Sequence, residues 1–229
     1  MNDRKRRVDK QKIGYFHLNI LHWFKNKGRH FPWRNKSASN YEKIISEVLL
    51  QRTKAGTAAR FYPGFINKYP SWSKLAEATE EELKEALTPI GLQKQRAKRV
   101  FALAREMKKR RGRFPNDREE IESIPMFGQY ITNAIMLLVY GKPFPLLDVN
   151  MSRVLERFFG PREMSDIRYD PYLQDLAYKI VNLPQPQQIN WAILDFAALV
   201  CRARAPLCKA CPINSRCKYY KVNERKKRD

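Results

Sequence analysis

The sequence has 229 residues, of which 43% are hydrophobic, enough to fill the core of one large domain or two small ones. Its formal charge of +22 favours a polyanionic partner, above all nucleic acid, although charge alone also allows a generally basic protein or one that binds a membrane surface. No apolar run approaches the roughly 18 residues that a membrane span needs, and the charged first residues lead into no signal-peptide core. We therefore expect an intracellular, cytoplasmic protein with no membrane partner.

Helical periodicity runs through the whole chain. The first helix is predicted from about Ile13 to the stop signal at Gly28. No convincing period-two run bounded by hairpin turns appears, so the predicted fold class is all-α. Residues 1–12 are predicted to be frayed, and 218–229 to form a flexible basic extension that adds non-specific attraction to phosphate. The remaining helices are predicted at 41–51, 57–68, 71–78, 80–87, 93–110, 117–123, 129–140, 150–159, 171–181 and 188–200.

All four cysteines fall in one short stretch near the end of the sequence. They are Cys201, Cys208, Cys211 and Cys217, separated by six, two and five residues. Four thiolates so close together indicate a metal centre rather than a disulfide framework, and the ligand types alone allow either zinc or an iron–sulfur cluster. Zinc ribbons usually combine two Cys-x2-Cys pairs, whereas this sequence has one.

The six, two, five spacing resembles the cysteine loop of the endonuclease III and MutY DNA glycosylases. This resemblance implies a [4Fe–4S] cluster as cofactor. Residues 123–130 (SIPMFGQY) also resemble the helix-hairpin-helix motif of that superfamily. The motif implies that backbone amides near Gly128 and Gln129 hold a DNA phosphate. Met126 replaces the motif's first glycine and is strained if that position needs a positive φ, and an ordinary helix–turn–helix connection remains the alternative.

Asp148 lies between an apolar run and a predicted helix, where an Asp is most often a helix N-cap. Its separation of eighteen residues from Tyr130 matches the family's arrangement of two residues that face each other across the substrate cleft. The resemblance therefore implies that Asp148 is catalytic and stabilises positive charge on the sugar or activates water. Bifunctional relatives have lysine at the position of Tyr130, and a phenol cannot form their imine, so a monofunctional enzyme is expected. The alternative for Tyr130 is a core aromatic residue.

The segments 31–34 (FPWR) and 46–53 (SEVLLQRT) resemble both the MutY adenine glycosylases and the MIG thymine glycosylases. Three features favour the MIG type: residues 52–56 (RTKAG), residues 90–97 (IGLQKQRA), and the end of the sequence soon after the cysteines. Glu47 has apolar neighbours, so we expect a partly desolvated carboxyl that donates a proton or a hydrogen bond to a flipped base. The alternative is an exposed charge or a partner of the helix dipole in the N-terminal half of the helix. Arg52, with Gln51 beside it, and Leu92 lie where relatives insert side chains into the base stack, although both residues also suit packing or phosphate contact.

These patterns predict two helical domains with a DNA-binding cleft between them. Residues 1–31 and 141–229 would form a cluster domain, and 32–140 a central domain with the hairpin. The expected function is a monofunctional DNA N-glycosylase of base excision repair that flips and removes thymine or uracil opposite guanine. We expect a monomer that binds double-stranded DNA containing a mismatched or damaged base. The alternatives are a minimal MutY-like adenine glycosylase, a non-catalytic helix-hairpin-helix DNA-binding protein, and a redox or zinc-stapled regulatory protein.

Overall fold

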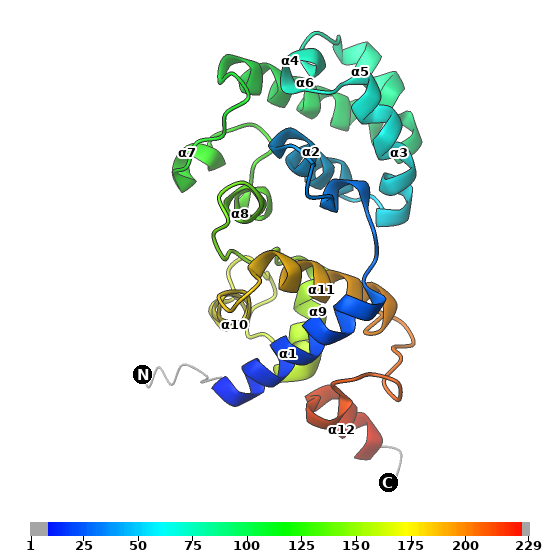
Figure 1. Ribbon diagram of the computed structural model, residues 1–229, viewed down its shortest axis with the longest axis vertical. Coiled ribbons are helices and arrows are strands. Elements are labelled where there is room, and N and C mark those ends of the chain that lie inside the picture. The colour runs from blue at the N-terminus through cyan, green and yellow to red at the C-terminus, as the bar shows by residue number, and fades with distance from the viewer. Residues whose placement is uncertain (1–8, 226–229) are drawn as a thin grey trace. The chain divides into compact units, whose positions relative to one another are not determined.

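The computed structural model describes residues 9–225, and every regular element in that range is a helix (Figure 1), which confirms the all-α prediction. No helix among these residues is long and apolar enough to cross a membrane. The α-helices are α1 (Lys10–Lys27), α2 (Asn40–Leu50), α3 (Ala55–Lys68), α4 (Trp72–Leu75), α5 (Glu80–Leu87), α6 (Gln93–Lys109), α7 (Arg118–Glu122), α8 (Gln129–Leu138), α9 (Val149–Phe159), α10 (Pro171–Val181), α11 (Pro186–Leu199) and α12 (Lys218–Arg225). Three short 3-10 helices are η1 (Pro32–Arg34), η2 (Thr88–Ile90) and η3 (Asn214–Arg216).

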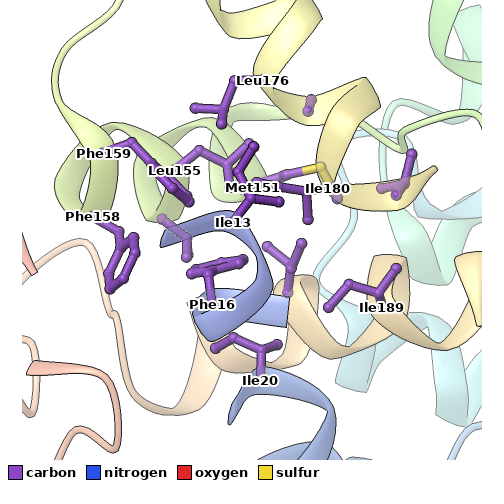
Figure 2. Close-up of a cluster of buried hydrophobic side chains, with 14 of the residues drawn as sticks. Ile13, Phe16, Ile20, Met151, Leu155, Phe158, Phe159, Leu176, Ile180 and Ile189 are labelled. Carbon is purple, nitrogen blue, oxygen red and sulfur yellow. The ribbon is translucent and has the colours of Figure 1, made fainter. Parts of the chain in front are cut away.

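The chain divides into two compact units, one of which combines the N-terminal segment up to Arg29 with the chain from Gly141 onward. In this unit α1 packs against α10 and α11, and α9 packs against α10, α11 and α12. The apolar faces of α1, α9, α10 and α11 form its core (Figure 2). The ring of Phe16 lies 5.1 Å from that of Phe158 and 5.4 Å from that of Phe159, measured between centroids. Burial of these rings ties α1 to α9, although more than a hundred residues separate them in the chain.

A buried ion pair fixes the end of the N-terminal segment to α11. The Asp195 side chain is 0% exposed and accepts hydrogen bonds from the Arg29 backbone N–H at 2.7 Å and from its guanidinium Nε at 2.9 Å and Nη2 at 2.7 Å. A buried carboxylate without such donors would be strongly destabilising. The pair therefore specifies where the chain leaves this unit.

The second unit comprises His30–Tyr140. Here α2 packs against α3 and α8, while α4 and α5 pack against α6. Two of the helices begin at capping boxes, in which Ser39 pairs with Glu42 and Thr79 with Glu82. These caps define where α2 and α5 start, so the buried faces of both helices are set by local sequence.

Two predictions about the chain ends are wrong. The first helix begins at Lys10 rather than near Ile13, because the Asp9 side chain caps it and accepts from the Gln11 N–H at 2.9 Å. The predicted flexible extension forms helix α12 over most of its length, since α12 packs against α9 and the Arg157 guanidinium lies 4.7 Å from the centroid of the Tyr219 ring. Residues 1–8 and 226–229 lie outside the described part of the chain.

The connection between α7 and α8 contains the residue that replaces the hairpin glycine. Met126 has φ +72°, so a side chain occupies a left-handed backbone conformation there. The Phe127 N–H donates to the Ile124 carbonyl at 3.0 Å and closes the turn. Gly128, in contrast, has an extended conformation with φ −96° and is the N-cap of α8. The strain expected at this position is therefore present.

We predict that Met126→Gly is more stable than Met126→Ala by about 1 kcal/mol, because both variants lose the long side chain but only alanine keeps the Cβ that a positive φ disfavours. Urea denaturation of the two variants measures the difference. Gly128→Ala is the matched control, and it should be neutral or stabilising because its φ is negative and a Cβ there meets no atom within 4 Å. Equal or reversed stabilities at position 126 would contradict the assignment of strain.

Candidate functional site

Asp148 is the N-cap of α9 and is half-buried. Its Oδ1 accepts from the backbone N–H of Asn150 at 2.9 Å and of Met151 at 2.8 Å. Its Oδ2 accepts from the side-chain nitrogen of Asn150 at 2.7 Å. Three donors and the positive end of the α9 dipole thus hold the carboxylate in one orientation. The N-cap interpretation is correct, and it is compatible with catalysis because a carboxylate can accept about four hydrogen bonds.

A chain of hydrogen bonds runs from this carboxylate to the first cysteine. The Asn150 Oδ1 accepts from Arg153 Nη1 at 3.2 Å. Arg153 Nε donates to the Cys201 carbonyl at 3.0 Å, and its Nη2 donates to the Ala197 carbonyl at 3.0 Å. Sequence reasoning missed Asn150 and Arg153, although their three-residue spacing on one helix was a signal that their side chains could meet.

The four cysteines are half-buried free thiols, and all of them line one pocket with about 370 Å³ of empty space, part of it open to solvent. Arg157 anchors their loop to α9. Its Nη1 donates to the Arg202 carbonyl at 2.7 Å and approaches the Cys201 Sγ at 3.5 Å, while Nη2 donates to the Ala203 carbonyl at 3.1 Å. One guanidinium therefore holds the start of the loop in place.

The donor set fits a cluster that takes one thiolate per iron. Burial, together with the neighbouring thiols, raises the pKa of Cys211 to about 12, and burial also raises the pKa of Cys217. These groups are neutral thiols unless a metal binds them, and the backbone N–H groups of Tyr219 and Tyr220 already point at the Cys217 sulfur. Among residues 9–225 no three His, Cys, Asp or Glu side chains are close enough to share a single ion. All four thiols line one pocket, where each of them would hold one iron of a bound cluster.

Glu47 and Tyr130 meet inside the other unit. Glu47 on α2 is 5% exposed, and its Oε2 accepts from the Tyr130 hydroxyl on α8 at 3.0 Å. Helix packing brings these two side chains together from positions 83 residues apart. Sequence reasoning had singled out both residues without predicting their contact.

The predicted DNA-contacting residues lie at helix ends in the same unit. Gln51 is the C-cap of α2, and the exposed Arg52 follows it with φ +56°. Leu92, which is 49% exposed, has φ +55° and is the N-cap of α6. Gly128 is the N-cap of α8, and no side chain caps the start of this helix at Gln129.

Comparison with known proteins places residues 45–177 in a family model described as HhH-GPD superfamily base excision DNA repair protein. The chain is similar to a thymine-DNA glycosylase of Aeropyrum pernix, with 35% identity over 93% of this chain and 97% of the relative. It is also similar to a thymine/uracil-DNA glycosylase of Pyrobaculum aerophilum, with 34% identity over 90% of this chain and 92% of the relative. The solved structure of a thermostable thymine-DNA glycosylase matches with a TM-score of 0.85 and 32% identity, over 93% of this chain and 98% of that structure.

Proposed function

The chain belongs to the HhH-GPD superfamily of base excision DNA repair proteins, and we propose that it is a monofunctional DNA N-glycosylase that removes thymine or uracil opposite guanine. The substrate assignment is supported by the similarity to relatives named thymine-DNA and thymine/uracil-DNA glycosylases. This similarity extends over about nine-tenths of this chain and of each relative. The reaction adds water across the bond between base and sugar. It leaves an abasic site, and the released base carries the proton.

Asp148 acts at the sugar in this proposal. Breaking the N-glycosidic bond builds positive charge at the anomeric carbon, and a carboxylate that is already oriented stabilises that charge without reorganising. Its geometry supports the role, since Asn150 and Met151 hold it from one side. The fixed anion also attracts the proton of the incoming water.

Glu47 and Tyr130 act at the flipped nucleotide. Each already hydrogen-bonds the other, so a base that enters beside them meets an oriented carboxyl and an oriented phenol. Tyr130 has no amine that could attack the sugar, and the DNA strand therefore stays intact. This supports excision without strand cleavage.

Three exposed parts of the chain contact the DNA in this proposal, two in the base stack and one at the backbone. The Arg52 and Leu92 side chains fill the space that the flipped base leaves, with Gln51 beside them, because a cation and an apolar wedge both suit an opened base stack. The uncapped start of α8, at Gly128 and Gln129, binds a backbone phosphate through its N–H groups. As the sequence led us to expect, we propose a monomer that acts on mismatched duplex in the nucleoid.

The four cysteines would hold a [4Fe–4S] cluster in the unit that also contains Asp148. When bound, the cluster supplies a structural cross-link made of iron–sulfur bonds. Arg153 and Arg157 then connect this cross-linked loop to α9. The chain's own contribution is to keep the start of α9, and with it Asp148, in a fixed position.

The substrate assignment is tested with duplexes in which thymine, uracil or adenine lies opposite guanine or 8-oxoguanine. Single-turnover excision of thymine and uracil opposite guanine should exceed that of adenine by at least about tenfold, the discrimination that one set of base contacts provides. Faster excision of adenine would make the chain a minimal adenine glycosylase. Binding without excision of any base would leave a non-catalytic DNA-binding protein.

Asp148→Asn keeps the shape of the side chain but removes its charge. Excision of uracil opposite guanine should fall by roughly 10²–10³-fold while the affinity for the duplex stays within a few-fold, because the charge acts in the transition state. Asp166→Asn is the matched control, since Asp166 ion-pairs with Arg168 on the surface of the same unit. A parallel loss of DNA binding and thermal stability would mean that Asp148 serves only as a helix cap.

Tyr130→Lys introduces an amine beside Glu47. The variant should gain strand cleavage and become trapped on DNA by borohydride, which reduces the imine formed with the sugar. Tyr130→Phe is the control and should excise the base without any trapping. If the lysine variant still excises uracil but shows neither cleavage nor trapping, residue 130 does not face the sugar.

Purified protein prepared without air should contain about four irons and four acid-labile sulfides per chain. Cys208→Ser should reduce the iron content and expose the loop from Cys201 to Cys217 to proteolysis, because the cross-link is lost. Lys209→Ser, next to it in the same loop, is the control and should retain the iron. Stoichiometric zinc without labile sulfide would contradict the cluster assignment.

A further inference from the structure

Arg96 is a buried cation on α6 for which the proposed function has no role. The side chain is 5% exposed, and burial lowers the pKa of its guanidinium from the ordinary value. Each of its hydrogen bonds ends on a neutral oxygen. Burying a charge without an ionic partner costs several kcal/mol unless good hydrogen bonds compensate, so this arrangement calls for an explanation.

The first group of partners lies at the C-terminal end of α2. Arg96 Nη1 donates to the carbonyls of Val48 at 3.4 Å and Leu49 at 3.2 Å. The last carbonyls of a helix lack their regular partners; the Gln51 N–H reaches the Val48 carbonyl at 3.4 Å, and the guanidinium supplies further donors. Its charge also matches the negative end of the helix dipole.

The second group lies in the loop that follows. Arg96 Nη2 donates to the Gln51 carbonyl at 3.0 Å and to the Thr53 Oγ1 at 3.0 Å. These two acceptors flank Arg52, which has φ +56° and points to solvent. The guanidinium therefore holds the backbone on both sides of the exposed arginine.

The third partner lies in the other exposed loop. Arg96 Nε donates to the Gly91 carbonyl at 3.3 Å, directly before Leu92 with its φ of +55°. A left-handed conformation costs a residue other than glycine about 1–2 kcal/mol, so both loops need external support. One planar group with five donors supports both of them, which a lysine ammonium cannot do in the same geometry.

We propose that Arg96 is a positioning residue that joins the 51–53 loop to the 91–92 turn, so that Arg52 and Leu92 enter the DNA as one rigid wedge. This inference rests on the proposed function, because it takes both residues to fill the gap left by the flipped base. Arg96 itself contacts neither the base nor the sugar. Because Arg96 orders the two loops before DNA binds, the free energy of binding is available to open the duplex.

The test separates duplex opening from chemistry. The probe is a duplex with uracil opposite guanine and 2-aminopurine beside the uracil, whose fluorescence rises when the stack opens. At saturating enzyme, Arg96→Lys should reduce the fluorescence rise and slow single-turnover excision about tenfold or more, whereas excision of uracil from an unpaired bulge should change less than about twofold. Arg105→Lys is the matched control, since Arg105 is exposed on the same helix, and it should behave as the unmodified chain does.

Thr53→Val and Thr53→Ser form a milder pair that tests the same link if the Arg96 variant does not fold. Valine keeps the shape but removes the oxygen that accepts from Arg96, and serine restores it. Thr53→Val should lower the fluorescence rise and duplex excision without lowering the melting temperature by more than about 5 °C, and Thr53→Ser should recover both.

Two results would overturn the inference: an unchanged fluorescence rise in Arg96→Lys and Thr53→Val, or an equal loss of excision on paired and bulged uracil. Either would leave Arg96 as a purely structural residue. Failure of the proposed function is seen separately, because the unmodified chain would then excise no uracil from either substrate.

Discussion

The ends of helices leave backbone polar groups without partners, and the side chains of Asp148 and Arg96 satisfy such groups in this protein. Asp148 supplies acceptors at the start of α9, and Arg96 supplies donors at the end of α2. Both residues hold their helix ends through several hydrogen bonds, so the attached loops have little freedom. In the proposal above, Arg52 and Leu92 depend on Arg96 for their positions.

The same constraint explains how a strongly basic chain can act at one nucleotide. A formal charge of +22 attracts any duplex and carries no information about mismatches. Selectivity for a mismatch requires side chains that enter the duplex only where the base stack opens easily. We propose that Arg52 and Leu92 are such features, because their left-handed backbones are supported from within the unit rather than by their own sequence preferences.

Much of the fold could be predicted from the sequence, because apolar periodicity and turn residues are local signals. The predicted helix at 80–87 agrees with α5, and that at 171–181 agrees with α10. Helix α12 was missed, because its charged sequence has low hydropathy and its stability comes from packing on α9 and from Arg157. Contacts such as Glu47 with Tyr130, and Arg96 with two separate loops, join distant parts of the chain and leave no periodic trace. The candidate residues could thus be named from motifs, whereas the interactions that orient them required the structure.

We propose that the protein stabilises a cationic sugar, a property that can be measured as binding to a charged analogue. A duplex can carry, opposite guanine, either a pyrrolidine whose ring nitrogen is protonated or an uncharged tetrahydrofuran of the same shape. We expect the protein to bind the pyrrolidine duplex at least about 100-fold more tightly, since analogues of a transition state gain affinity from the groups that stabilise it. Equal affinities for the two duplexes would mean that no group of the protein recognises positive charge at the sugar, and Asp148 would then have no such role.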